Sequence, residues 1–233
     1  MFPELKRRVF EANMALRDHG LIVLTWGNVS ECDRARGIFA IKPSGVAYDA
    51  LKVEDIVIVD FDGDVVEGSL QPSSDVLTHA VLYNHFTNIG GITHTHSRYA
   101  VIWAQTGRDI PAYGTTHADF SYGPVPCTRG LTDEEIADFY EIETGQVITS
   151  LFDSETIDPT GIPAVLVRSH GPFTWGKDAR ESVNNAVTLE EVAMMALCTE
   201  TLSNGPVSPV SNKLLNKHFL RKHGSEAYYG QTR

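Results

Sequence analysis

The chain has 233 residues, of which 42% are hydrophobic and 21% charged, as in globular proteins with an ordinary core. Its formal net charge of −11 argues against nucleic acid or an anionic membrane as a partner, because both bind through basic surfaces. This length favours a single domain over residues 1–233. No apolar run is long enough for a signal peptide or a membrane span, so we expect a cytoplasmic protein.

The cysteines are few and far apart in the sequence. Cys32, Cys127 and Cys198 are odd in number and lack the clustered spacing of a zinc ribbon. We expect reduced thiols in the core, and neither a disulfide framework nor a cysteine-based metal site.

The predicted secondary structure begins with an amphipathic helix, because apolar residues recur every three or four positions from Leu5 to Leu16 and stop before Gly20. Short runs rich in Val and Ile predict strands over 38–41, 56–61, 91–95 and 163–167. Helices are predicted over 76–86, 98–105, 132–143 and 180–202, and loops over 153–161 and 203–211. Alternating strands and helices without a glycine-rich nucleotide loop indicate the α/β class, with parallel or antiparallel pairing left open.

Three histidines and one aspartate are candidate metal ligands. His94 and His96 lie at the end of a predicted strand, where side-chain alternation turns both imidazoles to one face. His170 ends another apolar run, at a strand terminus where sites of layered α/β proteins collect. Asp75 begins a predicted helix and offers a carboxylate. Three imidazoles with one carboxylate suit zinc or a similar divalent ion. Surface histidines and a helix-start acid are the alternatives.

Two short segments are candidate anion-binding loops, which a strongly acidic chain needs if its substrate is a phosphate. Ser73 and Ser74 precede a predicted helix, so they either face a phosphate or serve as ordinary N-caps. The segment Lys42-Pro43-Ser44-Gly45 follows a predicted strand and forms either a backbone nest beside a lysine or a plain β-turn.

Taken in order, these motifs resemble those of the class II aldolase family. The resemblance rests on Thr25-Trp26-Gly27-Asn28-Val29-Ser30, Lys42-Pro43-Ser44-Gly45, Pro72-Ser73-Ser74-Asp75, His94-Thr95-His96 and Ser169-His170-Gly171. It extends over nearly the whole chain and is strongest to the sugar-phosphate epimerases of that family. The segments that match these epimerases are Gly114 to Asp119, Glu141 to Gly145, Leu220 to Gly224 and Ala227 to Gln231.

The resemblance implies a three-layer α/β/α sandwich with a central, mainly antiparallel sheet, assembled as a homotetramer with sites between subunits. It implies that His94, His96 and His170 bind Zn²⁺ or Mn²⁺, with Asp75 as a further ligand or close neighbour. Asp119 and Tyr229 fall at the positions of catalytic acid/base groups. The positions that would line the substrate pocket are Asn28, Lys42, Ser44, Gly45, Ser73, Ser74, Glu141, His218 and Arg221.

The implied activity is inversion of carbon 4 of L-ribulose 5-phosphate to give D-xylulose 5-phosphate, by cleavage and re-formation of a carbon-carbon bond. One alternative is an aldolase of the fuculose- or rhamnulose-phosphate type, although such aldolases carry Glu in the region of Asp75. A second is a non-enzymatic, adducin-like interaction domain. The latter lacks the histidines retained here at 94, 96 and 170.

Overall fold

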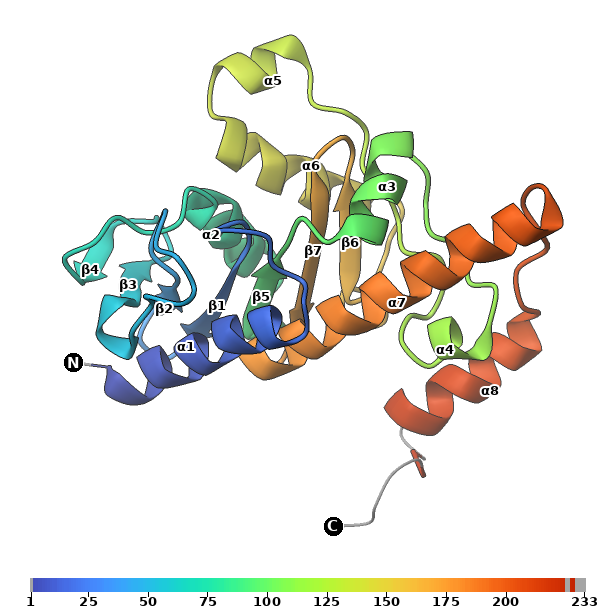
Figure 1. The fold of residues 1–233 in the computed structure, drawn as a ribbon, viewed down its shortest axis with the longest axis horizontal. Coiled ribbons are helices and arrows are strands. Elements are labelled where there is room, and N and C mark those ends of the chain that lie inside the picture. The colour runs from blue at the N-terminus through green and yellow to red at the C-terminus, as the bar shows by residue number, and fades with distance from the viewer. Residues whose placement is uncertain (1, 225–226, 229–233) are drawn as a thin grey trace.

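A computed structural model describes residues 2–224 and 227–228, within which seven strands form one sheet with every neighbouring pair antiparallel (Figure 1). The strands are β1 (Asn28–Asp33), β2 (Ile38–Ile41), β3 (Val57–Asp60), β4 (Val65–Glu67), β5 (Gly91–His94), β6 (Ala164–Val167) and β7 (Gly171–Gly176). Their order across the sheet is β4-β3-β2-β1-β5-β7-β6. The expectation of a mainly antiparallel α/β sheet is confirmed.

Helices cover both faces of the sheet. The long helices are α1 (Pro3–Asp18), α2 (Val76–His85), α3 (Arg98–Thr106), α6 (Tyr140–Ser154), α7 (Ala179–Ser203) and α8 (Asn212–His223). Shorter ones are η1 (Val53–Asp55), α4 (Thr115–Ala118) and α5 (Asp133–Ala137). Side-chain alternation along β6 sends Ala164 and Leu166 toward α3 and α7, and Val165 and Val167 toward α2 and α6. These two helical layers and the sheet give the expected three-layer arrangement.

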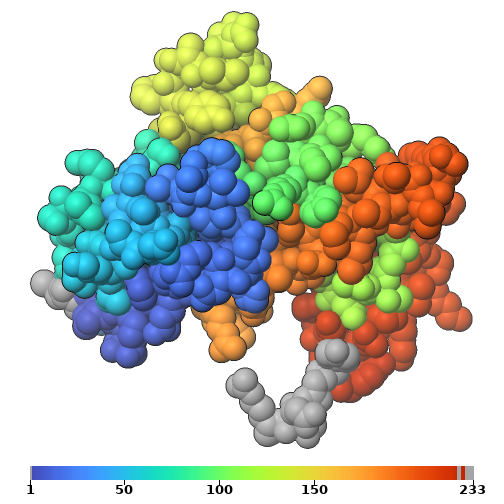
Figure 2. All heavy atoms as spheres, in the orientation of Figure 1, coloured from blue at the N-terminus to red at the C-terminus, as the bar shows by residue number. Residues whose placement is uncertain are grey.

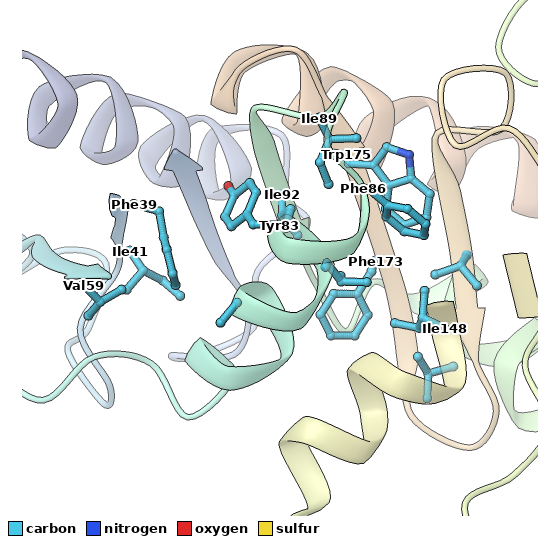
Figure 3. Packing of buried hydrophobic residues seen from close by; sticks show 14 of the residues in the cluster. Phe39, Ile41, Val59, Tyr83, Phe86, Ile89, Ile92, Ile148, Phe173 and Trp175 are labelled. Carbon is cyan, nitrogen blue, oxygen red and sulfur yellow. The ribbon is translucent and has the colours of Figure 1, made fainter. Parts of the chain in front are cut away.

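The aromatic part of the core lies between the sheet and the α2–α6 layer (Figure 3). Phe86, which caps the C-terminus of α2, packs against Trp175 of β7 and Phe152 of α6, with ring centroids 5.3 Å apart in both pairs. Burying each such side chain stabilises the fold by about 1.5–3 kcal/mol. Phe173 of β7 belongs to the same cluster, so the core continues beneath the end of the sheet where the histidines converge.

One predicted helix is divided in the structure. The segment predicted as a single helix over 132–143 forms α5 and the start of α6, with a break at Asp138 and Phe139. The capping box that starts α5 is present, since Glu135 N–H donates to Thr132 Oγ1 and Thr132 N–H donates to Glu135 Oε2. Packing of α6 against α2 therefore overrides the local helical pattern.

The sequence pattern did not predict three strands, β1, β4 and β7, or the helices α4 and α8.

The prediction that all three cysteines lie in the core is only partly right. All three are free, but Cys198 is exposed on α7, and Cys32 and Cys127 are only half-buried. None of the described helices is long and apolar enough to cross a membrane.

Candidate active site

Three histidine side chains converge at one end of the sheet. His94 is the last residue of β5, His96 follows two positions later, and His170 lies in the turn between β6 and β7. The ring centroids are 4.8–5.2 Å apart, and the candidate ligand atoms all lie within 4.8 Å of one another. His96 reaches the cluster from a loop and not from the strand itself, which differs from the sequence prediction.

Neighbouring groups orient two of the three rings. His94 Nδ1 lies 2.9 Å from the Pro172 carbonyl oxygen, which can only accept, so Nδ1 carries the proton and Nε2 keeps a free lone pair. The Phe173 ring stacks on His94 with centroids 4.3 Å apart. The Tyr140 hydroxyl lies 3.3 Å from His170 Nδ1. These contacts hold both imidazoles in fixed planes.

Two of the three histidines, His96 and His170, have the protonation state that metal binding requires. Burial, and next the neighbouring His94, lower the pKa of His170 to about 3. The same two causes lower the pKa of His96. Both rings are therefore neutral near neutral pH, and neutral imidazole is the form that binds a metal ion. Three converging imidazoles suit a divalent ion and leave coordination positions for substrate oxygens.

Asp75 borders the histidine cluster and does not cap helix α2. It occupies the residue before the helix, but its carboxylate makes no capping hydrogen bond. Instead its Oδ2 accepts a 2.6 Å hydrogen bond from Asn28 Nδ2, which also donates to Ser73 Oγ at 3.0 Å. Burial acts to raise the pKa of Asp75, but His94, His79 and the Asn28 amide together lower it. The carboxylate is thus ionised beside the proposed metal ligands.

Two loops form another wall of the same cavity, which has a volume of about 380 Å³. They are joined by backbone hydrogen bonds of 3.0 Å, from Ser44 N–H to the Gln71 carbonyl and from Ser73 N–H to the Lys42 carbonyl. The predicted site residues that line the cavity are Asn28, Lys42, Ser44, Gly45, Ser73, Ser74, Asp75, His94, His96, Glu141 and His170. The structure therefore brings the candidate metal and anion groups together.

The mouth of the cavity presents unused hydrogen-bond donors. Gly45 has φ of +68°, a left-handed conformation that glycine adopts without strain, and it is exposed beside Ser44. Ser74 is exposed as well, and neither Ser73 nor Ser74 is the N-cap of α2. Within the described residues, the backbone N–H groups of Gly45 and Ser74 have no hydrogen-bond partner. Free N–H groups near a helix N-terminus suit an anionic ligand.

Lys42 is a buried cation facing this cavity. Only 2% of the residue is exposed, and Nζ donates to the Pro43 carbonyl oxygen at 3.2 Å. Burial lowers the pKa of Lys42 to about 8. No ion pair of Lys42 occurs in the part of the chain that the structure describes. Because a buried charge without a counter-ion is costly, a bound anion would stabilise the ammonium.

A second group of predicted residues lies elsewhere. Asp119 follows α4, which packs with α8 in a lobe below α7, green and red in Figure 2. Its carboxylate accepts hydrogen bonds from Arg221 Nη2 at 2.6 Å and from His218 Nδ1 at 3.0 Å. None of the three lines the histidine cavity, and Asp119 borders a separate cavity of about 620 Å³. Tyr229 lies outside the described residues.

Three residues in or around the cavity are functional candidates that sequence reasoning missed, and of these Tyr140 lines the cavity itself. Tyr140, Phe173 and Tyr48 contact His170, His94 and Lys42, respectively. The only available signal was that Phe173 follows closely after the candidate ligand His170. Tyr140 contacts His170 from a distant segment, whereas Tyr48 follows closely after Lys42 without a pattern that marks it as a partner.

Sequence comparison gives consistent matches. A family profile described as Class II Aldolase and Adducin N-terminal domain matches residues 7–197. A protein described as L-ribulose-5-phosphate 4-epimerase UlaF, from Salmonella paratyphi A (strain ATCC 9150 / SARB42), is 53% identical over 228 residues. The match covers 98% of this chain and 99% of that protein. A protein of the same description from Salmonella typhi matches with the same identity and coverage.

Solved structures share the fold. One described as L-fuculose 1-phosphate aldolase superposes with a TM-score of 0.76 at 25% identity, covering 92% of this chain and 94% of that one. YgbL, a putative aldolase/epimerase/decarboxylase from Klebsiella pneumoniae, gives a TM-score of 0.72 at 22% identity, covering 92% and 97%.

Proposed function

The chain belongs to the class II aldolase family, and on that premise we propose that it interconverts L-ribulose 5-phosphate and D-xylulose 5-phosphate. The observation that carries this proposal is 53% identity over nearly the full length of a protein described as L-ribulose-5-phosphate 4-epimerase. A three-histidine cluster beside anion-binding loops is the arrangement that a metal-dependent sugar-phosphate enzyme requires. Conversion of L-ribulose 5-phosphate by the metal-loaded protein tests the proposal.

The chemistry has to invert a carbon whose hydrogen is not acidic. Carbon 4 of the pentulose is β to the ketone, so removing its proton would not give a stabilised carbanion. Deprotonation of the carbon 4 hydroxyl instead lets its oxygen electrons form an aldehyde while the bond between carbons 3 and 4 breaks. The products are an enediolate and glycolaldehyde phosphate. Rotation of the aldehyde and re-addition, with return of the proton, give the epimer.

His94, His96 and His170 would hold the metal ion, which we propose to be Zn²⁺, with Mn²⁺ as the alternative. A divalent ion in this site supplies Lewis-acid stabilisation for the negative charge of the enediolate. Asp75, held by the Asn28 amide, lies close enough to the histidines to influence the same site.

The phosphate-binding part of the site keeps the aldehyde fragment during its rotation. We assign Ser44, Gly45, Ser73 and Ser74 to the phosphate, with Asn28 and Lys42 beside them. Support comes from the free N–H groups at the mouth and from the buried ammonium, because both favour an anion. Glu141 lines the same cavity and is assigned to substrate binding.

Asp119 and Tyr229 are proposed as the acid/base groups that serve the two faces of the aldehyde, with His218 and Arg221 beside Asp119. Burial acts to raise the pKa of Asp119, but hydrogen bonds from Arg221 and His218 lower it. The carboxylate is therefore ionised, which is the form that can accept a proton. Because Asp119 is absent from the lining of the histidine cavity, we propose a homotetramer in which sites form between subunits.

The aldolase alternative differs in its products. An aldolase of the fuculose-phosphate type would release a free triose phosphate from other ketose phosphates without epimerising L-ribulose 5-phosphate. Assaying both products with one preparation of metal-loaded protein separates the two activities.

We expect Ser74→Ala to weaken the binding of phosphorylated substrate without changing metal content. A charge-assisted hydrogen bond to phosphate is worth about 1.5–3 kcal/mol, which corresponds to a loss of about 10- to 100-fold. Within the described chain the exposed Ser74 hydroxyl makes no hydrogen bond, so its removal should leave the fold intact. Unphosphorylated L-ribulose is the control substrate. Equal losses on both substrates would mean that Ser74 does not contact the phosphate.

We expect the affinity for inorganic phosphate to fall as pH rises above about 8, the pKa to which burial lowers Lys42. Below this value Lys42 is an ammonium, and above it the neutral amine gives the phosphate dianion no charge. The decline should approach about tenfold per pH unit. Titration calorimetry across this range measures it, and Lys42→Met is the matched control. A decline of the same steepness in Lys42→Met would contradict the assignment.

A further inference from the structure

Tyr48 contacts both the Lys42 side of the site and the Gly27–Asn28 side. It is buried and is not one of the proposed metal ligands. It is 3% exposed and follows the loop that carries Lys42. Its ring lies beneath the Lys42 ammonium, with Nζ 4.9 Å from the ring centroid. Its hydroxyl donates a 2.9 Å hydrogen bond to the Gly27 carbonyl oxygen. Burial raises the pKa of Tyr48 above its ordinary value, so the hydroxyl stays protonated and remains a donor.

The ring contact bears on the charge of Lys42. A desolvated ammonium over an aromatic face is attracted by the ring quadrupole. In the described chain the other polar contact of Lys42 Nζ is the Pro43 carbonyl oxygen at 3.2 Å. Within the described chain, the Tyr48 ring and the Pro43 carbonyl are therefore the two groups that can stabilise the charge of this buried side chain.

The hydroxyl contact bears on the metal side of the cavity. Gly27 packs so closely against the end of β5 that a Cβ there would lie 2.9 Å from the His94 carbonyl oxygen. The next residue, Asn28, pairs with His94 across β1 and β5, and its amide donates to Asp75. Fixing the Gly27 carbonyl thus fixes the backbone that positions the Asn28 amide.

We propose that Tyr48 is a positioning residue with two separable roles: its ring holds the Lys42 cation for the anionic group of the substrate, and its hydroxyl holds Gly27 and Asn28. This inference rests on the proposed function. It predicts that the two roles appear in different measurements.

Tyr48→Phe keeps the ring and removes the hydroxyl, so affinity for inorganic phosphate should stay within about twofold of wild type while kcat falls. One lost hydrogen bond corresponds to a decrease in kcat of about 2- to 10-fold. Tyr48→Leu removes both contacts and should weaken phosphate binding by about tenfold or more, with a matching rise in KM. If the Tyr48→Leu variant does not fold, the Tyr48→Met variant, which also lacks the ring and the hydroxyl, is measured in its place.

A double-mutant cycle shows whether the ring acts through Lys42. In a Lys42→Met background, Tyr48→Leu should cause no further loss of phosphate affinity, because the cation is already gone. Tyr83→Phe is the matched control. It removes another buried tyrosine hydroxyl, bonded to Ser30 in the core, and should lower Tm without changing phosphate affinity or kcat.

Additive effects of Lys42→Met and Tyr48→Leu, or wild-type phosphate affinity in Tyr48→Leu, would overturn the proposal. Phosphate binding is measured without turnover. If the proposed epimerisation is wrong, the wild-type protein forms no product. If this inference is wrong, Tyr48→Leu leaves phosphate affinity unchanged, or its loss of affinity adds to that of Lys42→Met.

Discussion

His96→Ala should abolish epimerisation by loss of the metal ion and not by loss of the fold. The remaining two histidines cannot hold an ion in working geometry. Removing only the group that orients a metal ligand lowers metal affinity by about 10- to 100-fold, so removing the ligand itself should lower it further. His96 is exposed and lies in a loop, so its truncation removes little packing. Metal analysis and circular dichroism on one sample measure both properties.

His19→Ala is the matched control for this variant, because His19 is an exposed histidine at the end of α1. It should keep full metal content and activity. A folded His96→Ala variant with full metal occupancy would mean that the metal site is misplaced.

Asp119→Asn and Tyr229→Phe should each lower turnover by about 10²- to 10⁴-fold, the usual effect of removing a positioned proton-transfer group. Neither change should alter metal content, because Asp119 does not line the histidine cavity. Steady-state kinetics and metal analysis test this for each variant.

The two inactive variants together test whether the groups come from different subunits. If they are unfolded and reassembled in equal amounts, each site draws Asp119 from one chain and Tyr229 from its neighbour at random. About one quarter of the sites then carry both native groups, so activity should return to about a quarter of wild type. A mixture that stays inactive despite proven subunit exchange would place both groups in one chain or refute their pairing.

The sequence predicted the elements whose apolar pattern is regular. The strand at 38–41 appears with the expected bounds, and the long helix expected at 180–202 is α7, Ala179–Ser203. The central strand β1 was missed because most of its buried side chains are polar. Ser30 bonds to the His79 ring and Glu31 accepts from Arg8 and from the α7 N-terminus. Such partners come from distant segments and leave no local periodicity.

The candidate site was predictable in part. The spacing of His94 and His96, with His170 at a second strand end, indicated a shared metal site, and the structure brings the three together. The roles of Tyr140 and Tyr48 depend on contacts with His170 and Lys42 that no pattern in the sequence indicates. The burial of Lys42, without an ion pair among the described residues, is likewise a property of packing and cannot be recognised from its neighbours in the sequence.

Turnover in D₂O tests whether epimerisation proceeds through cleavage of the carbon-carbon bond. Metal-loaded protein is incubated with L-ribulose 5-phosphate, and the D-xylulose 5-phosphate formed is analysed by NMR at carbon 4. Cleavage between carbons 3 and 4 never breaks the bond from carbon 4 to its hydrogen. We therefore predict that the product forms and retains its original hydrogen there. Absence of the epimer, or deuterium at carbon 4, would contradict the account.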